Sequence, residues 1–214
     1  MTTVNSKTRS YTPWAIGAGV VLVALVGAIV IAATRGDDLA ADPAAIVETN
    51  AVVIDGAALP ELAGADTALG APAPTATGTG FDGLRVDLLA DGEPTVIGFF
   101  AHWCPVCQQE VDELSDHLRD GGLPDDVRVV AVSTGVRSDN TNYPPSAWFA
   151  DEQWPAPVLL DDADNSLAEA YGLPAFPFWA AVDSDGRIVA RLSGAIGAST
   201  FDDLVDLARN GVPA

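Results

Sequence analysis

Cys104 and Cys107 are the residues of this chain best suited to chemistry, because they are its only two cysteines and are separated by two residues. The Cys-Pro-Val-Cys stretch follows an apolar run at 94–103 and opens a helix-like run at 108–119. Two thiols at such a strand-to-helix junction can interconvert between a dithiol and a disulfide. The spacing therefore predicts redox chemistry performed on other proteins.

The position of each thiol predicts a different role. Cys104 lies at the expected helix N-terminus, where the helix dipole and the free backbone N–H groups favour a thiolate. Cys107 lies one turn further on, in an apolar stripe with Val111, Leu114 and Leu118, and should be shielded. We expect Cys104 to attack a substrate disulfide and Cys107 to resolve the mixed disulfide within the molecule.

Glu110 is a candidate base for the Cys107 proton. It lies three residues after Cys107, at the edge of the apolar stripe. A partly buried carboxylate there would have a raised pKa and could accept a proton. The alternative is an ordinary surface glutamate near a helix start, and the residues alone leave the two interpretations equal.

Two other uses of the cysteine pair are disfavoured. A structural disulfide with this spacing closes a very small loop and would stabilise the fold little. A zinc site would need further ligands, and His117 lies roughly 20 Å from Cys104 along the same helix. We therefore expect no metal and no bound cofactor. His117 is expected on the helix surface, and His102 is expected to be exposed beside the site, where it tunes Cys104 electrostatically.

Residues 174–179, Pro-Ala-Phe-Pro-Phe-Trp, form a second candidate segment at the start of an apolar strand. From position alone, the bond before Pro177 is expected to be trans, because only about 5–6% of X–Pro bonds are cis. Trp103, Phe176 and Trp179 could belong to the core or frame an apolar groove. The core is the favoured location for an isolated aromatic side chain.

A long apolar segment lies near the N-terminus. Residues 14–33 carry no charge, and about 1.5 Å per residue gives roughly 30 Å, the thickness of a bilayer core. Lys7 and Arg9 precede it and favour a cytoplasmic N-terminus. An uncleaved anchor is favoured over a cleaved signal peptide, whose apolar region is usually shorter. The expected segments are a cytoplasmic N-terminus at 1–13, a transmembrane anchor at 14–34, an extracytoplasmic linker at 35–67 and the folded domain at 68–214.

Both interpretations of the apolar segment place the remaining chain outside the cytoplasm, where a disulfide can persist. The net charge is −20, and all 30 acidic residues follow the apolar segment. Nucleic acid is therefore disfavoured as a partner, because its phosphates would be repelled. The acidic surface is explained either by solubility or by electrostatic steering of a basic partner.

The elements that must position the candidate residues alternate between strand and helix. This order predicts an α/β fold with a central mixed β-sheet flanked by helices. The segment 57–80 is interpreted as an extended loop, because it is dense in Ala, Gly, Pro and Thr. Strands are expected at 51–54, 84–88, 95–101, 127–132, 158–160, 178–182 and 187–192, and helices at 108–119, 146–152, 165–170 and 199–209.

Residues 99–110, Phe-Phe-Ala-His-Trp-Cys-Pro-Val-Cys-Gln-Gln-Glu, resemble the active-site segment of the thioredoxin superfamily. They are most similar to its membrane-anchored, extracytoplasmic TlpA/ResA-like branch, and the similarity covers roughly residues 68–210. Residues 70–74, 84–88 and 171–183 match that branch's N-terminal motif, early strand and cis-proline segment. The resemblance implies a thioredoxin-like fold preceded by one transmembrane helix.

The resemblance also implies roles for individual residues. Pro177 would be the cis-proline that faces the disulfide, and Phe176 before it would contact the substrate backbone. Glu110 would be the helix glutamate near the active site. The expected site residues are Cys104, Cys107, Glu110 and Pro177 for catalysis, and Trp103, Phe176 and His102 for substrate binding.

Departures from the family pattern leave the direction of electron flow open. The buried aspartate of thioredoxin, six residues before the first cysteine, corresponds here to Gly98, which leaves Glu110 as the available acid. Pro105 directly follows the nucleophile, as in DsbA-type oxidants, whereas most of the branch has proline second. Phe176 replaces a residue that is commonly small or polar.

We expect a membrane-anchored, extracytoplasmic thiol–disulfide oxidoreductase, with a TlpA/ResA-like reductase favoured over a DsbA-like oxidase. Its partners would be protein thiols and disulfides, apo-cytochrome c among them, and a membrane redox protein. A non-catalytic thioredoxin-like binding or assembly module is the alternative from another class. A peroxidase is disfavoured, because Ala101 stands where a peroxidase would carry threonine.

Overall fold

The computed structural model describes residues 48–211. The expected cytoplasmic N-terminus, the expected transmembrane anchor and the first part of the expected linker lie outside these residues. None of the helices in 48–211 is both long and apolar enough to cross a membrane.

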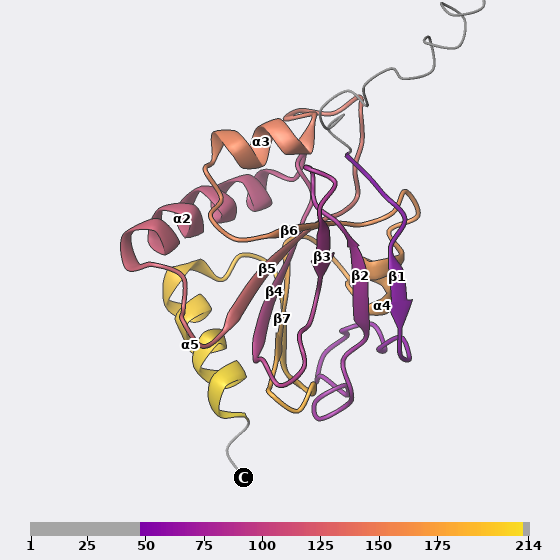
Figure 1. Cartoon of the computed structure of the whole chain (residues 1–214), viewed down its shortest axis with the longest axis vertical. Coiled ribbons are helices and arrows are strands. Elements are labelled where there is room, and N and C mark those ends of the chain that lie inside the picture. Colours follow the sequence, from indigo (N-terminus) through magenta and orange to yellow (C-terminus); the bar gives the residue numbers. More distant parts are fainter. Residues whose placement is uncertain (1–47, 212–214) are drawn as a thin grey trace, which may run out of the picture. The chain divides into compact units, whose positions relative to one another are not determined.

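A five-stranded mixed sheet forms the centre of the described domain (Figure 1). Its strands are β4 (Thr95–Phe100), β5 (Arg128–Ser133), β6 (Val158–Leu160), β7 (Phe178–Val182) and β8 (Ile188–Ser193). The strand order is β6-β5-β4-β7-β8, in which β4, β5 and β6 are parallel and β7 is antiparallel to both neighbours. The predicted mixed sheet is therefore confirmed, and β4 is its central strand.

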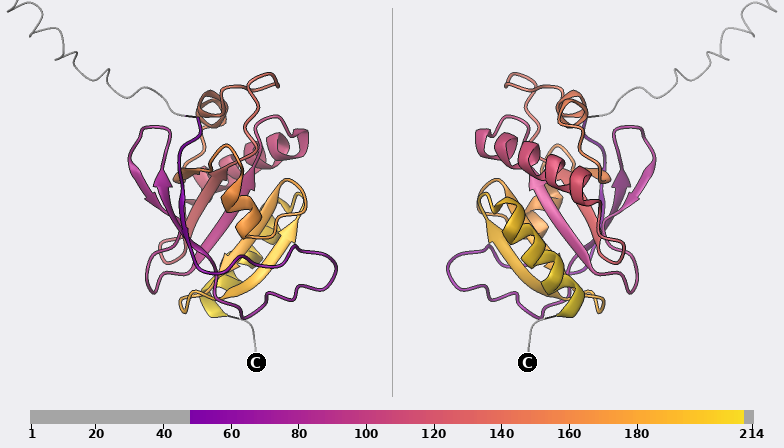
Figure 2. Two further views of the ribbon diagram at one scale, coloured as in Figure 1. Left: turned by 90° about the vertical axis from the view of Figure 1, so that its right-hand side faces the viewer. Right: turned by 90° about the vertical axis from the view of Figure 1, so that its left-hand side faces the viewer.

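Helices cover both faces of this sheet (Figures 1 and 2). They are α2 (Pro105–Gly121), α3 (Pro145–Asp151), α4 (Ser166–Ala170) and α5 (Gly197–Asn210). The long helices α2 and α5 lie side by side on one face, and α4 lies on the opposite face. His117 is on the surface of α2, as expected, and its Nε2 atom lies 2.8 Å from Asp202 Oδ1 of α5.

Strand β4 is buried on both faces, as its nearly continuous apolar sequence predicts. Val96 and Phe100 point toward the core beneath α2 and α5. Ile97 and Phe99 point toward the second core, beneath α4 and the N-terminal part of the domain. Because the strand is enclosed in this way, the residues that follow it are held at a fixed place at the edge of the sheet.

A second, three-stranded antiparallel sheet was only partly expected. It consists of β1 (Val53–Asp55), β2 (Thr75–Thr79) and β3 (Arg85–Asp87), in that order. The expectation of an extended loop over 57–80 is therefore wrong for β2. The sequence Thr-Ala-Thr-Gly-Thr alternates β-branched and small residues. The small residues are needed, since a Cβ on Gly78 would lie 2.8 Å from Leu159 Cδ1.

Residues 48–67 belong to the domain, although the sequence analysis placed them in the linker. Strand β1 pairs with β2, and the backbone N–H groups of Leu59 and Leu62 donate to the carbonyls of Ala170 and Gly172, at 2.8 and 2.9 Å. Gly172 has a φ of +66°, and a Cβ there would meet Pro60 O at 2.3 Å. The composition of the segment does not indicate this packing, because its contacts are with residues far away in the sequence.

A buried ion pair fixes the end of this segment. The side chain of Arg191 is 0% exposed, and it binds Asp66 through Nε at 3.0 Å and Nη2 at 2.5 Å. Its Nη1 donates to the carbonyls of Pro60 and Tyr171 at 2.9 and 2.8 Å. Hydrogen bonding to Arg191 lowers the pKa of Asp66. The buried cation is thus fully paired, and it joins the N-terminal segment to β8.

We predict that Asp66→Ala lowers the free energy of unfolding by about 3–5 kcal/mol, because it leaves the Arg191 charge buried and unpaired. Urea denaturation of the 214-residue chain followed by tryptophan fluorescence measures this loss. The stabilisation is present above the unfolded-state pKa of Asp66 and is lost as the pH falls through the folded-state pKa.

Asp126→Ala is the matched control, because Asp126 forms an exposed pair with Arg209. Its loss should be about 0–1 kcal/mol. Equal losses for the two variants would show that the Asp66–Arg191 pair does not hold the N-terminal segment.

Candidate active site

The site begins where β4 ends and α2 starts. Cys104 is the N-cap residue of α2, with an extended backbone, and its Sγ atom accepts a hydrogen bond from Cys107 N at 3.4 Å. Pro105 occupies the first position of the helix, where a backbone N–H would have no partner within the helix. The local sequence therefore supplies a helix start in which a thiol is the capping group.

Cys104 faces the cis-proline segment. The peptide bond between Phe176 and Pro177 is cis, which confirms the expectation from the resemblance and contradicts the expectation from position alone. The Cys104 thiol lies 3.8 Å from the Phe176 carbonyl oxygen, to which it donates. Tyr143–Pro144 is a second cis bond, which no sequence pattern predicted.

Cys107 is shielded, as the helical wheel predicts. It is 0% exposed, against 8% for Cys104, and it packs with Val111 and Leu114 beneath α2. Burial raises the pKa of the Cys107 thiol, and the neighbouring Cys104 and Glu110 add to this effect. Both cysteines are free thiols in this structure. Cys107 is therefore less exposed than Cys104, and its thiol is harder to ionise than an ordinary cysteine thiol.

Glu110 is buried, at 2% exposed, so the interpretation as an ordinary surface glutamate is wrong. Its carboxylate accepts hydrogen bonds from the backbone N–H groups of Ile196 at 2.8 Å and of Gly197 at 3.3 Å. Burial raises the pKa of Glu110, although these two hydrogen bonds oppose the shift. Glu110 is close enough to Cys107 for its negative charge to raise the pKa of the Cys107 thiol.

The contact between Glu110 and α5 corrects the expected cap of the last helix. Ser199 or Thr200 was expected to cap it, but α5 begins at Gly197 and has no side-chain cap of its own. Its free N–H groups are bound by Glu110 and by Glu113, whose Oε1 accepts from Ala198 N at 3.1 Å. The caps come from another helix, so no local sequence pattern could reveal them.

The structure explains why Gly98 replaces an acid at the centre of β4. Gly98 pairs with Trp179 across β4 and β7. A Cβ on Gly98 would lie 2.7 Å from the Phe100 ring and 2.8 Å from the Trp179 ring. The two aromatic rings, with centroids 5.2 Å apart, fill the space that an aspartate would need. The acid that acts on the Cys107 thiol is instead Glu110, which lies on α2.

His102 is buried, at 1% exposed, so the expectation of an exposed residue is wrong, and its expected effect on Cys104 stays a prediction. Its Nδ1 lies 2.7 Å from the Thr141 carbonyl oxygen, and its Nε2 accepts from Arg137 N at 3.1 Å. This pairing requires the proton on Nδ1. The ring thus holds the connection between β5 and α3 against the site, and its expected role in substrate binding stays a prediction. The sequence could not show that this distant connection folds over His102.

Trp103 and Phe176 frame a groove beside Cys104, as one of the two interpretations of these residues proposed. Their rings meet edge to face with centroids 6.1 Å apart, and Trp103 Nε1 donates to Gly135 O at 2.7 Å. Trp179 instead lies in the core. The groove has a volume of about 380 Å³ and is lined by Trp103, Gly135, Val136, Arg137, Ala163, Asn165, Ala168, Glu169, Leu173 and Phe176.

The buried carboxylate of Asp161 binds residues beside the groove and was not among the predicted site residues. Asp161 accepts hydrogen bonds from Thr134 Oγ1 and from the backbone N–H groups of Leu167 and Ala168. Burial raises its pKa. Asn165, expected to cap α4, makes no capping hydrogen bond and instead accepts from Gly135 N at 2.8 Å. Asp161 and Asn165 together fix the backbone against which Trp103 docks.

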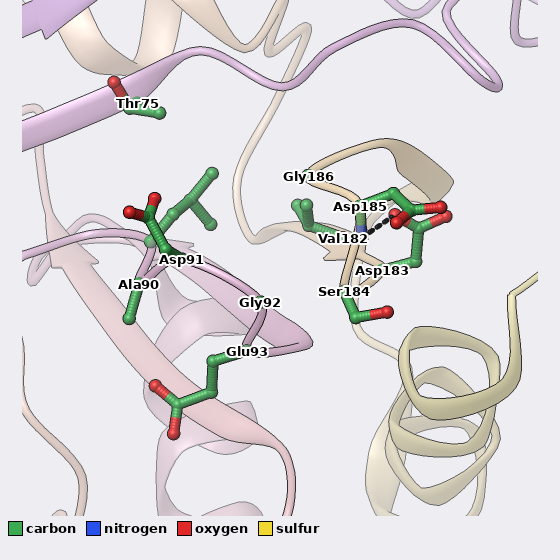
Figure 3. A pocket seen from close by; sticks show the side chains of 11 residues that line it. Thr75, Ala90, Asp91, Gly92, Glu93, Val182, Asp183, Ser184, Asp185 and Gly186 are labelled. Atoms are coloured by element: carbon green, nitrogen blue, oxygen red, sulfur yellow. Dashed lines mark hydrogen bonds between the residues drawn. The ribbon is translucent and has the colours of Figure 1, made fainter.

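A second hollow lies at the other end of β4 (Figure 3). It has a volume of about 190 Å³, between the turn before β4 and the β7–β8 hairpin. Figure 3 shows its carboxylates, among them Asp91, Glu93 and Asp183. Its lining includes no thiol, imidazole or cationic side chain, so it does not share the chemistry of the Cys104 site.

Several characterised proteins are similar to this chain. They include the thiol:disulfide interchange protein DsbE of Haemophilus influenzae, at 29% identity over 117 residues, covering 54% of this chain and 59% of that protein. The thiol-disulfide oxidoreductase ResA of Bacillus subtilis is 23% identical over 143 residues, covering 61% and 70%. The chain spans about six tenths of the length of the DsbE proteins that it matches.

Solved structures show the same fold. A DsbF homologue from Corynebacterium diphtheriae has a TM-score of 0.56 at 21% identity and covers 71% of this chain and 99% of that chain. The thio-disulfide isomerase from Thermus thermophilus has a TM-score of 0.52 at 26% identity and covers 68% and 99%. The thioredoxin-like fold is thereby confirmed, as is the resemblance to the TlpA/ResA-like branch. The Redoxin family profile matches residues 68–206, more than half of the chain, and this protein therefore belongs to the Redoxin family.

Proposed function

We propose that this chain is a protein thiol–disulfide oxidoreductase that works through Cys104 and Cys107 without a bound cofactor. The observation that carries this proposal is the unequal placement of the two thiols at the start of α2. Cys104 lies against the cis-proline segment at the side of a groove, and Cys107 is buried beneath it. Membership of the Redoxin family and the similarity to DsbE and ResA support this class of reaction.

In the first step, the Cys104 thiolate attacks one sulfur of a substrate disulfide. A bond forms between Cys104 and that sulfur, the substrate S–S bond breaks, and the leaving sulfur takes a proton from solvent. The Cys107 backbone N–H, 3.4 Å from Cys104 Sγ, and the N-terminus of α2 both stabilise the attacking thiolate.

In the second step, Cys107 loses its proton and attacks Cys104 Sγ. The Cys104–Cys107 disulfide forms, the bond between Cys104 and the substrate sulfur breaks, and the released substrate thiolate takes a proton from solvent. Glu110 receives the Cys107 proton, because its raised pKa makes the carboxylate a better base than an exposed one. Two electrons and two protons pass from the enzyme dithiol to the substrate disulfide, and the reverse sequence would install a disulfide.

We favour the reductase direction, with apo-cytochrome c among the substrates and a membrane redox protein that returns electrons to the cysteine pair. The similarity to ResA supports it. Pro105, which suggested a DsbA-like oxidase, has a structural reason in either direction, because the first position of α2 requires no N–H donor. The oxidase remains the alternative direction for the same pair of thiols.

We also propose an extracytoplasmic location, with residues 14–34 as a single membrane anchor. The uncharged, apolar sequence of this segment supports the anchor. Thiol–disulfide exchange supports the location, because disulfides persist outside the cytoplasm. A non-catalytic binding module is disfavoured, since it would have no need of a shielded second thiol beside a buried carboxylate.

We predict that Cys107→Ser accumulates covalent complexes with protein substrates, because Cys104 still attacks but no resolving thiol follows. Non-reducing electrophoresis and mass spectrometry of the 214-residue chain from cells detect these complexes. Cys104→Ser is the control and should trap nothing. A Cys107→Ser chain that forms no mixed disulfide would show that Cys104 is not the nucleophile, and it would support the binding module.

We predict that Glu110→Gln slows the release of substrate from the mixed disulfide by about tenfold or more, because the Cys107 proton loses its acceptor. Glutamine keeps an oxygen to accept from Ile196, so α5 retains a cap. In the unmodified chain, the release rate rises as the pH passes through the raised pKa of Glu110, and the variant loses this rise. Quenched-flow kinetics with a model disulfide peptide measure both effects.

Glu113→Gln is the matched control, because Glu113 caps the same helix start but is exposed. It should leave the release rate unchanged. If both variants release substrate as fast as the unmodified chain, Glu110 acts only as a cap of α5.

We predict a reduction potential for the Cys104–Cys107 pair near that of thioredoxin, about −270 mV, if the chain is a reductase. Equilibration of the purified chain with glutathione or dithiothreitol buffers measures the potential. A value near that of DsbA, about −120 mV, would reverse the proposed direction.

A further inference from the structure

Arg137 differs from every other arginine in residues 48–211. It is exposed, in the connection between β5 and α3, and its guanidinium donates no hydrogen bond to any described residue. Each of the others donates to a carboxylate or a carbonyl oxygen: Arg85, Arg119, Arg128, Arg187, Arg191 and Arg209. In a chain with a net charge of −20, an arginine whose guanidinium has no hydrogen-bond partner is unexpected.

The guanidinium of Arg137 is held in a way that leaves its hydrogen-bond donors available. Its Cζ atom lies 4.3 Å from the ring centroid of Trp103, so one face of the cation is stacked on the indole. The N–H groups around its edge remain free for a carboxylate, which a planar guanidinium can bind through two hydrogen bonds.

The backbone of Arg137 is fixed as well. Its N–H donates to Nε2 of the buried His102, and Gly135 nearby donates to Asn165. Trp103, on which the guanidinium stacks, is bound to the Gly135 carbonyl. The guanidinium of Arg137 is therefore held in place before a substrate binds. His102 is a positioning residue for Arg137, because it binds the Arg137 backbone.

Arg137 lines the groove beside Cys104, together with Trp103 and Phe176. Trp103 precedes Cys104 in sequence, and the Phe176 carbonyl oxygen lies 3.8 Å from the Cys104 thiol. The groove also holds one carboxylate, that of Glu169, so its lining carries one charge of each sign. An acidic residue would be attracted near Arg137 and repelled near Glu169, which gives a bound segment a preferred orientation.

We propose that Arg137 is a specificity-determining residue that selects substrate segments carrying an aspartate or glutamate close to the reactive cysteine. This inference rests on the proposed oxidoreductase function and adds the class of substrate. The overall negative charge of the chain slows the approach of acidic proteins in general. The positive charge of Arg137 offsets this repulsion in the groove beside Cys104.

The test uses three disulfide peptides that differ only in the residue next to the cysteine, which is Glu, Gln or Lys. The rate constant for oxidation of the reduced 214-residue chain is measured with each peptide at low salt. The unmodified chain should react about two- to fivefold faster with the Glu peptide than with the Gln peptide, the range of an exposed ion pair. This preference should shrink at high salt.

Arg137→Gln should bring the Glu/Gln rate ratio to about one, and Arg137→Glu should make the Lys peptide the fastest of the three. Arg85→Gln is the matched control, because it removes the same charge from β3 and should keep the original ratio. The ratio within each variant corrects for any general change in reactivity.

Two results would overturn the proposal in distinguishable ways. A chain that oxidises with all peptides but keeps its Glu/Gln ratio in Arg137→Gln, or prefers Lys without mutation, would refute the role of Arg137 alone. A chain that reacts with none of the peptides would refute both this role and the proposed function.

Discussion

The site depends on the interaction between the Cys104 sulfur atom and the free backbone N–H groups at the start of α2. They are held in place because β4, which leads into the helix, is enclosed by side chains on both faces. Cys104 fills the capping position with a sulfur atom, and Pro105 needs no partner at the next one. One helical turn then carries Cys107 into the core. A single turn of helix thus separates a thiol at the helix start from a thiol in the core.

The start of α5 is hydrogen-bonded to the site helix α2. The N–H groups at the beginning of α5 are bound by Glu110, which reaches across from α2. The same carboxylate lies close enough to Cys107 to act on its pKa. Aromatic rings fill the space around Gly98 at the centre of the sheet, so no acid could stand there. Glu110, the proposed proton acceptor for Cys107, is also a structural cap of α5 and is buried between the two long helices.

Features with a local signature could be predicted from the sequence. The apolar stripe of α2, the burial of β4 and the later strands were predicted correctly. The cis bond before Pro177 followed from the family resemblance. Features made by contacts between distant segments could not be predicted. The burial of His102, the packing of residues 48–67 on the domain and the stacking of Arg137 on Trp103 all depend on side chains and backbone groups that meet only after folding.

The most direct test of the account is the alkylation of each thiol in the reduced, folded chain at neutral pH. Brief treatment with iodoacetamide, followed by peptide mapping, measures the two rates separately. We predict that Cys104 is modified rapidly and that Cys107 reacts only after denaturation, because the first caps a helix and the second is buried. Equal rates for the two cysteines, or faster modification of Cys107, would contradict the unequal roles on which the proposed function rests.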